Sequence, residues 1–345
     1  MVKGKASIEV YMGDKFLFPY DYLNELENEL KNRNKYNIYY VLKGPRLRIE
    51  SLNILDDMNC IVEICNLLED ERMEICVNAN FSFQVPDLSY IDLKIENNGS
   101  VLQIDFNEKG MEYLQEYEAE YLERKQEIVK EYGHIRWQFH VMFLRDMSMG
   151  RSSAETIDEY EVLYIGQSQK ETIYERLYGH NTIPEISRYL NRENDGEKYD
   201  IYILVTGVHI KYFKEYGDEQ YLTRIISSQN LSEDFLIKEG LITRSEVINI
   251  AEAILILFFK PEYNIKLKNS KKPEELTAYR IFKECLINPI TYSMDLYFED
   301  RKNKMVLKTD TIKTEYKQNV IKCEFDEMGR LKDILLEHFP VDLYL

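Results

Sequence analysis

The sequence contains no long uninterrupted run of apolar residues, and this absence limits where the protein can act. A helix needs roughly 18–20 consecutive apolar residues to cross a bilayer, and no run in the chain reaches that length. The first segment, MVKGKASIEVYMG, has two lysines but no apolar stretch after them, so a signal peptide is not predicted. We therefore expect a cytoplasmic protein that does not associate with a membrane.

The chain also lacks paired cysteines. Its five cysteines form no Cys-x-x-Cys motif and are odd in number. Cys60 and Cys65 lie in the apolar segment MNCIVEICNLL, where reduced core cysteines are expected rather than zinc ligands.

An excess of positive charge is missing as well. The 44 basic and 61 acidic side chains give a formal net charge of −17. The acidic excess is −11 over residues 1–134, −5 over 135–270 and −1 over 271–345. Non-specific coating of nucleic acid depends on neutralising phosphates, so this charge balance argues against it. A local basic cleft remains compatible with the sequence.

The pattern of apolar segments predicts an α+β protein with more than one domain, because 345 residues are too many for one small core. Residues 1–107 are interpreted as an N-terminal mixed α/β domain, and 108–134 as a long charged connector helix. Residues 135–270 form the expected central domain, and 271–345 a small C-terminal α/β extension. For the charged helix, packing on its own domain is favoured over the alternative, the seam of a homodimer.

The central region combines residue types that suit phosphate chemistry. The expected strand YEVLYIGQS contains Tyr164 and Gly166, and the expected helix KETIYERLYGH contains Arg176 and His180. A spacing of four residues places the last two on one helical face. A guanidinium binds phosphate oxygens, and an imidazole beside it can shuttle a proton or orient water.

Glu252 lies in a helix that is otherwise apolar, within TRSEVINIAEAILILFF. A buried carboxylate requires a cation or hydrogen bonds to stabilise it. A lysine or arginine in a structural ion pair is one interpretation. We favour a divalent metal ion, since Mg²⁺ keeps several waters and needs only one or two carboxylates.

Together these elements resemble the GIY-YIG nuclease superfamily. The matching residues, within about 135–270, are Tyr164-Ile165-Gly166, Arg176, His180, Glu252 and Lys260-Pro261-Glu262-Tyr263-Asn264. The resemblance implies a three-stranded antiparallel sheet flanked by helices, and hydrolysis of phosphodiester bonds. It also implies that Tyr164 activates or positions water with help from His180. Arg176 would stabilise charge on the phosphate, and Glu252 would hold one Mg²⁺ or Mn²⁺.

Other residues near the motif are expected to support the site. Gly166 is expected to let the chain turn sharply. Gln167, Ser168 and Lys170 are expected to bind substrate or to hold the site in place. Asn264 resembles the asparagine that ties the closing loop of the family to the site.

The first half of the family signature is absent from the strand expected to carry it. This strand, 140-HVMFL-144, has no Gly-Ile-Tyr, and Phe143 or Met142 would occupy the position of the tyrosine. His140 is the candidate substitute for the missing tyrosine.

The expected function is therefore a metal-dependent endonuclease that acts on nucleic acid, with DNA favoured over RNA. Restriction, anti-phage defence and mobile-element activity are roles that such a nuclease would suit. The alternative is a catalytically impaired module of the GIY-YIG fold that binds nucleic acid or a partner protein.

Overall fold

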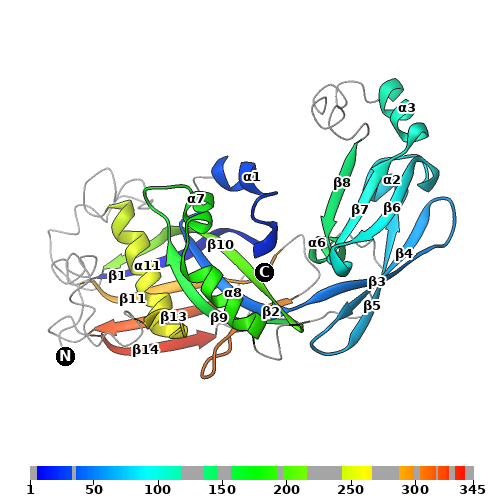
Figure 1. Cartoon of the computed structure of the whole chain (residues 1–345). Coiled ribbons are helices and arrows are strands. Elements are labelled where there is room, and N and C mark those ends of the chain that lie inside the picture. Colours follow the sequence, from blue (N-terminus) through cyan, green and yellow to red (C-terminus); the bar gives the residue numbers. More distant parts are fainter. Residues whose placement is uncertain are drawn as a thin grey trace.

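The structure is a computed structural model, and it describes ten segments of the chain. These are residues 6–32, 36–117, 135–146, 157–192, 197–215, 243–265, 287–298, 304–315, 318–325 and 331–338. Within them the protein has an α+β fold made mostly of strands, arranged as one eight-stranded sheet and two three-stranded sheets. Figure 1 shows the large sheet in one lobe and the small sheets in a second lobe.

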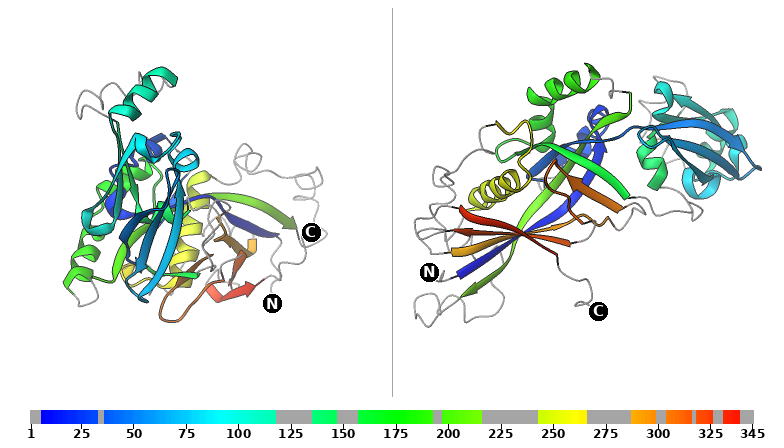
Figure 2. Two further views of the ribbon diagram at one scale, coloured as in Figure 1. Left: turned by 90° about the vertical axis from the view of Figure 1, so that its right-hand side faces the viewer. Right: turned by 90° about the horizontal axis from the view of Figure 1, so that it is seen from below.

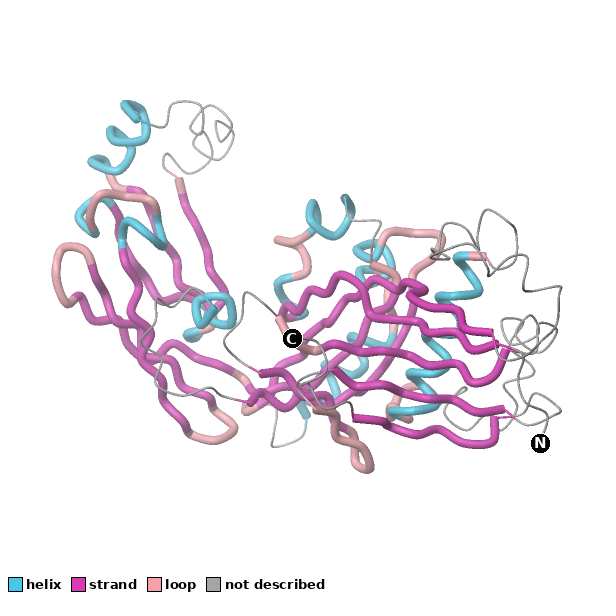
Figure 3. Tube along the Cα trace, turned by 180° about the vertical axis from the view of Figure 1, so that it is seen from behind, coloured by secondary structure: helices cyan, strands magenta, loops and turns pink. Residues whose placement is uncertain are grey.

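The large sheet gathers strands from distant parts of the chain. Its strand order is β12-β9-β2-β10-β1-β11-β13-β14. The bounds are β1 Ala6–Pro19, β2 Ile38–Pro45, β9 Ile157–Gln167, β10 Tyr199–Glu215, β11 Ile287–Asp295, β12 Lys304–Lys308, β13 Gln318–Phe325 and β14 Leu331–His338. The strands β9, β2, β10 and β1 are antiparallel to their neighbours in this series, whereas β12–β9 and β1–β11 are parallel pairs. Figure 3 shows these strands from behind.

Helices pack on both faces of this sheet. Helix α11 (Arg244–Phe259) lies on one face, and strands from both halves of the sheet share a core with it. Helices α1 (Glu27–Asn32), α7 (Ile173–Tyr178) and α8 (Thr182–Arg192) contribute to a separate core with β2, β9 and β10. Because adjacent residues in a strand point to opposite faces, Tyr39 enters the second core and Tyr40 the first.

The second lobe is inserted in the chain between β2 and β9. Figure 2 shows it beside the large sheet, joined where β2 leads into β3. One small sheet contains β3 Leu47–Ile54, β4 Asn59–Asn66 and β5 Glu71–Asn78, and the other β6 Ile91–Glu96, β7 Val101–Phe106 and β8 Arg136–His140. The short helices are α2 Ala79–Phe83, α3 Glu108–Tyr117, α6 Val141–Asp146, η2 Leu88–Tyr90 and η3 Asn97–Gly99, while η1 Tyr20–Tyr22 follows β1. This inserted lobe has its own hydrophobic core.

The strand pairing corrects the domain boundaries expected from the sequence, although the coarse α+β class is confirmed. Strands β1 and β2, expected in the domain 1–107, pair with β10 and β9 of the expected central domain 135–270. The segment 135–146, placed in that central domain, belongs to the inserted lobe through β8 and α6. Strands β11 to β14 complete the large sheet and do not form a separate extension at 271–345.

The domain boundaries could not be derived from the sequence, because alternation of apolar residues identifies a strand but not its partner. Of the connector expected at 108–134, the structure describes α3 (Glu108–Tyr117), and the rest lies outside the described residues.

None of the helices in the described segments is both long enough and apolar enough to cross a membrane.

Candidate functional site

Strands β2 and β9 bring two tyrosines from distant parts of the sequence to one face of the large sheet. In their antiparallel register Tyr39 is opposite Gly166, and Val41 is opposite Tyr164. The ring centroids of Tyr39 and Tyr164 are 6.0 Å apart. Both rings contact His180 edge-on, at centroid distances of 5.7 and 5.0 Å. We call Tyr39, Tyr164 and His180 the tyrosine–histidine cluster.

Gly166 makes room for this cluster. A Cβ atom at this position would overlap the hydroxyl and the ring of Tyr39, and would lie 2.8 Å from Cε1 of Tyr164. Gly166 is inside β9, before the strand ends at Gln167. The expectation of a sharp turn at this glycine is therefore wrong. Its missing side chain instead allows the Tyr39 ring to approach the backbone closely.

Arg176 reaches the cluster from α7. A capping box between Thr172 and Glu175 fixes the start of this helix. The Nη1 atom of Arg176 lies 3.6 Å from Oε1 of Glu171. Its Nε atom is buried and has no hydrogen-bond partner among the described residues, and the same holds for the Tyr39 hydroxyl. The Tyr39 hydroxyl and the Arg176 guanidinium lie close together, because each of them affects the pKa of the other.

The electrostatics of the tyrosines follow from their burial. Burial raises the pKa of Tyr39, and Tyr164 raises it further, whereas Arg176 opposes the shift. Burial and the carboxylate of Glu252 raise the pKa of Tyr164, and Tyr39 and Arg176 oppose this shift. Both hydroxyls therefore keep their protons at neutral pH. They can donate to or orient a water molecule, but they are poor general bases.

His180 contacts the cluster from a turn, not from the helix that carries Arg176. Helix α7 ends at Tyr178, Gly179 is its C-cap, and α8 begins at Thr182. The expectation that Arg176 and His180 share one helical face is therefore wrong. The sequence could not show it, because this helix is only six residues long and ends two residues before His180.

The hydrogen bonding of His180 indicates which ring nitrogen carries the proton. The backbone N–H of Thr182 donates to Nδ1 at 3.2 Å, so the proton of the neutral ring is assigned to Nε2. Burial and the nearby Arg176 lower the pKa of His180 to about 4. At neutral pH His180 is thus an uncharged hydrogen-bond donor through Nε2, and it is not available as a base through Nδ1.

Glu252 approaches from α11, on the other face of the sheet. Nε2 of Gln167 donates to its Oε2 atom at 2.6 Å. Burial raises the pKa of Glu252 to about 7, while Gln167 and Arg176 oppose the shift. Glu252 forms no ion pair with any of the residues that the structure describes. The structural ion pair considered from the sequence is therefore not formed within these segments.

The remaining expected site residues hold the backbone around the cluster. Asn264 donates through Nδ2 to the carbonyl of Ile165 and accepts from its N–H through Oδ1, both at 2.8 Å. This pair of bonds ties the segment after α11 to β9. The N–H of Ser168 donates to the carbonyl of Asn37 at 2.9 Å, and its hydroxyl donates to the carbonyl of Glu171. Lys170 is exposed in the same turn.

His140 does not belong to the cluster, and its expected role as a tyrosine substitute is wrong. It ends β8 of the inserted lobe, opposite Val101. Its ring contacts Tyr22 at 6.0 Å and Phe143 at 6.4 Å, and burial lowers its pKa to about 4. Most of 140-HVMFL-144 forms helix α6, not a strand.

The strand that lies beside β9 is β2, and its Tyr39 is the site residue that the sequence did not indicate. The expected partner was sought directly before the Tyr-Ile-Gly segment because most sequential strands pair. The inserted lobe separates the true partners. The signal that was available is the aromatic sequence Asn37-Ile38-Tyr39-Tyr40 at the start of a strongly apolar strand.

The described residues offer a single carboxylate, Glu252, that could hold a metal ion near the cluster. Over the described segments, no group of three or more His, Cys, Asp or Glu side chains is placed to hold a metal ion. Mg²⁺ commonly binds through one or two carboxylates and retains waters. Glu252 fits this role, since Gln167 engages only its Oε2 atom.

Comparisons with protein-family models, with curated proteins and with solved structures gave no match for this chain. The function therefore has to be inferred from the chemistry of these side chains.

Proposed function

We propose that the protein is a metal-dependent endonuclease of the GIY-YIG type, in which residues 46–156 separate the two halves of the signature. The pairing of β2 with β9 carries this proposal, because it brings Tyr39 beside Tyr164 and Gly166. A tyrosine on the strand next to the Tyr-Ile-Gly segment is what the resemblance requires.

The cluster suits the binding of a phosphodiester. Arg176 can donate to the non-bridging oxygens through the exposed part of its guanidinium. The Nε2–H of His180 is a second, uncharged donor. The protonated hydroxyls of Tyr39 and Tyr164 orient the attacking water. Its oxygen forms the new bond to phosphorus and releases a proton to solvent. The bond from phosphorus to the leaving oxygen breaks, and that oxygen takes up a proton from solvent.

Glu252 is the residue that would hold the cation, through Oε1. A divalent cation bound there supplies stabilisation of the negative charge on the leaving oxygen. The arginine on the opposite face of the sheet acts on the same carboxylate, because Arg176 lowers the pKa of Glu252. The two side chains therefore interact electrostatically.

The charge distribution also supports access of nucleic acid to this site. Residues 46–156 contain 11 basic and 22 acidic side chains, so they account for −11 of the net charge of −17. The rest of the chain, which includes the strands of the large sheet and their helices, carries only −6. Repulsion of phosphates is therefore weaker around the site than the composition suggests. We propose DNA as the favoured substrate and the host-defence or mobile-element roles as its setting.

The alternative of an impaired binding module depended on a missing signature tyrosine and on the acidic charge balance. Because Tyr39 lies beside Tyr164, the first of these observations no longer favours it.

The test is a cleavage assay with the purified full-length protein. Plasmid DNA and, separately, RNA are incubated in Mg²⁺, Mn²⁺ or EDTA with the wild type, Glu252→Gln and Arg176→Ala. We expect cleavage that requires the metal, and a loss of about 100-fold or more in each variant. Absence of cleavage by the wild type on both substrates, or variants that cleave as fast as the wild type, would contradict the proposal.

A further inference from the structure

We propose that Gln167 is a positioning residue for Glu252: its amide fixes one carboxylate oxygen and leaves Oε1 as the ligand for a divalent cation. The proposal rests on the proposed nuclease function for its chemistry. Its geometry comes from hydrogen bonds between β9 and α11.

The amide of Gln167 has a defined orientation. Its Nε2 atom donates to Oε2 of Glu252 at 2.6 Å and to Oδ1 of Asn249 at 2.8 Å. An amide nitrogen carries two hydrogens, so both are used. The Oε1 atom of Gln167 accepts from Nε2 of Gln169. A flipped amide would place two oxygens against each other, and the nitrogen therefore faces Glu252.

These bonds connect the strand of the tyrosines to the helix of the carboxylate. Asn249 lies three residues before Glu252, on the same face of α11. Gln167 ends β9, three residues after Tyr164. The side chain of Gln167 therefore sets the position of Glu252 relative to the tyrosine–histidine cluster.

A second glutamine in the molecule also donates its amide to a carboxylate, at a place where the contact stabilises the fold. In the inserted lobe, Nε2 of Gln103 donates to Oδ2 of Asp105 at 2.9 Å. Asp105 also accepts hydrogen bonds from Nε of Arg136 at 2.7 Å and from Nζ of Lys94 at 3.4 Å. Its negative charge is thus compensated by two cationic side chains.

Glu252 accepts a hydrogen bond from Gln167, but within the described segments it forms no such ion pair. An amide can orient a carboxylate, but it cannot neutralise one. Because charged groups are rarely buried without compensation, this partly buried carboxylate either keeps its proton or binds a cation from solution, and Oε1 is the atom left for the cation. Hydrogen bonds to ligating carboxylates commonly change metal affinity by about 10–100-fold.

The experiment measures binding of Mn²⁺ alone to the full-length protein by electron paramagnetic resonance, without nucleic acid. The variants are Gln167→Leu, the matched control Gln103→Leu and the ligand control Glu252→Gln. We expect Gln167→Leu to bind about 10–100-fold more weakly. Gln103→Leu should bind like the wild type, and Glu252→Gln should lose this site. Circular dichroism reports whether each variant is folded.

A folded Gln167→Leu variant with wild-type affinity would overturn the inference, as would a wild type that binds no Mn²⁺. If Gln167→Leu does not fold, Asn249→Ala removes the second acceptor of the same amide. Its affinity should then fall by several-fold, and an unchanged affinity would overturn the inference.

Plasmid cleavage by the same samples separates this inference from the proposed function. Weaker Mn²⁺ binding in Gln167→Leu together with an inactive wild type would support the positioning role and remove the nuclease. An active wild type with unchanged binding and cleavage in Gln167→Leu would keep the nuclease and remove the positioning role.

Discussion

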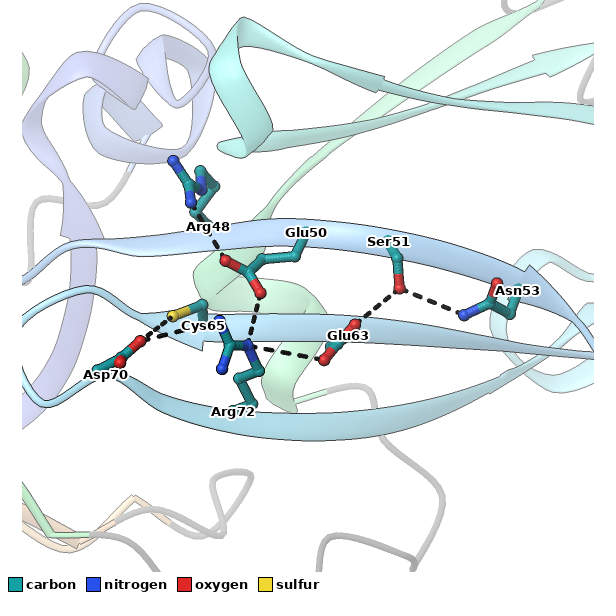
Figure 4. A network of polar contacts seen from close by, with 8 residues as sticks. All are labelled: Arg48, Glu50, Ser51, Asn53, Glu63, Cys65, Asp70 and Arg72. Carbon is teal, nitrogen blue, oxygen red and sulfur yellow. Dashed lines mark hydrogen bonds and ion pairs between the residues drawn. The ribbon is translucent and has the colours of Figure 1, made fainter.

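Charged side chains are paired with one another on the inserted lobe, whereas the key carboxylate on the large sheet has no ion-pair partner among the described residues. On the small sheet of β3, β4 and β5, Glu50 binds Arg48 at 3.1 Å and Arg72 at 2.8 Å (Figure 4). Hydrogen bonds from Arg72 and Arg48 lower the pKa of Glu50, and the bond from Arg72 has the larger effect. At the candidate site, burial raises the pKa of Glu252 to about 7, and none of the described residues forms an ion pair with it.

This difference distinguishes charged groups that stabilise the fold from charged groups that are available to bind a ligand. The charged groups in Figure 4 form ion pairs with one another on an exposed surface, so they need no additional partner. The site leaves the hydroxyl of Tyr39 and Nε of Arg176 without hydrogen bonds from the described residues. Shifted pKa values concentrate at functional sites. An unmet hydrogen bond alone does not mark such a site, since Ser82 of the inserted lobe and Tyr40 on the opposite face also lack partners among the described residues.

The largest contrast is expected in cleavage of nucleic acid when one arginine is removed from each region. Arg176→Ala should slow metal-dependent cleavage by about 100–1,000-fold, since the donor for the developing phosphate charge is lost. Arg72→Ala, in the exposed network, should cleave at the wild-type rate. Equal rates for the two variants would break the distinction between the regions.

The second contrast is in the pH dependence of stability. The pKa of Glu252 is about 7 in the folded protein, against an ordinary value of 4.5. Between these values the folded state keeps a proton that the unfolded chain releases, so Glu252 lowers stability as pH rises through this window.

Glu252→Gln removes this penalty. At pH 8 in EDTA, the variant should be more stable than the wild type by up to about 3 kcal/mol, and near pH 4 the difference should vanish. Urea titrations at the two pH values measure it. A variant that is less stable than the wild type at pH 8 would show that the carboxylate serves the fold.

The third contrast compares two glycines. Gly166→Ala should displace the Tyr39 ring, with a loss of about 1–3 kcal/mol in stability and a marked loss of cleavage. Gly179→Ala is the matched control. Its Cβ atom would meet only the carbonyl oxygen of Glu175, at 3.3 Å, and its φ of −83° suits any residue. Thermal denaturation and cleavage assays on both variants test this, and equal effects would exclude a specific role for Gly166.

The smallest effect is expected in the exposed network itself. Arg72→Ala should change the free energy of unfolding by less than about 1 kcal/mol, because exposed ion pairs contribute little and are screened by salt. Denaturation at low and high salt measures this difference. A loss of several kcal/mol would mean that the network holds the inserted lobe together.

Features encoded locally could be predicted from the sequence. The capping box at Thr243 and Glu246 starts α11 as expected, and the helix ends before Lys260, which adopts a left-handed conformation ahead of Pro261. Glu252 was recognised because a carboxylate among apolar residues is costly wherever the helix packs. The α+β class followed from the same local patterns.

Features that depend on long-range pairing could not be predicted. Tyr39 was missed because its strand pairs with β9 across the inserted lobe, and alternation of side chains does not encode that register. Gly166 was assigned to a turn because the ring above it comes from Tyr39. The position of His140 before the Tyr-Ile-Gly segment does not reveal that its strand belongs to the inserted lobe.

The central claim is that Tyr39 and Tyr164 belong to one catalytic site, and two adjacent tyrosines test it most directly. Tyr39 and Tyr40 are both fully buried, and both hydroxyls lack a hydrogen-bond partner among the described residues. Tyr40 points to the opposite face, where its ring contacts Phe259 at 6.5 Å. Metal-dependent cleavage should fall by about 10-fold or more in Tyr39→Phe and stay at the wild-type rate in Tyr40→Phe. Equal rates for these two variants would contradict the account.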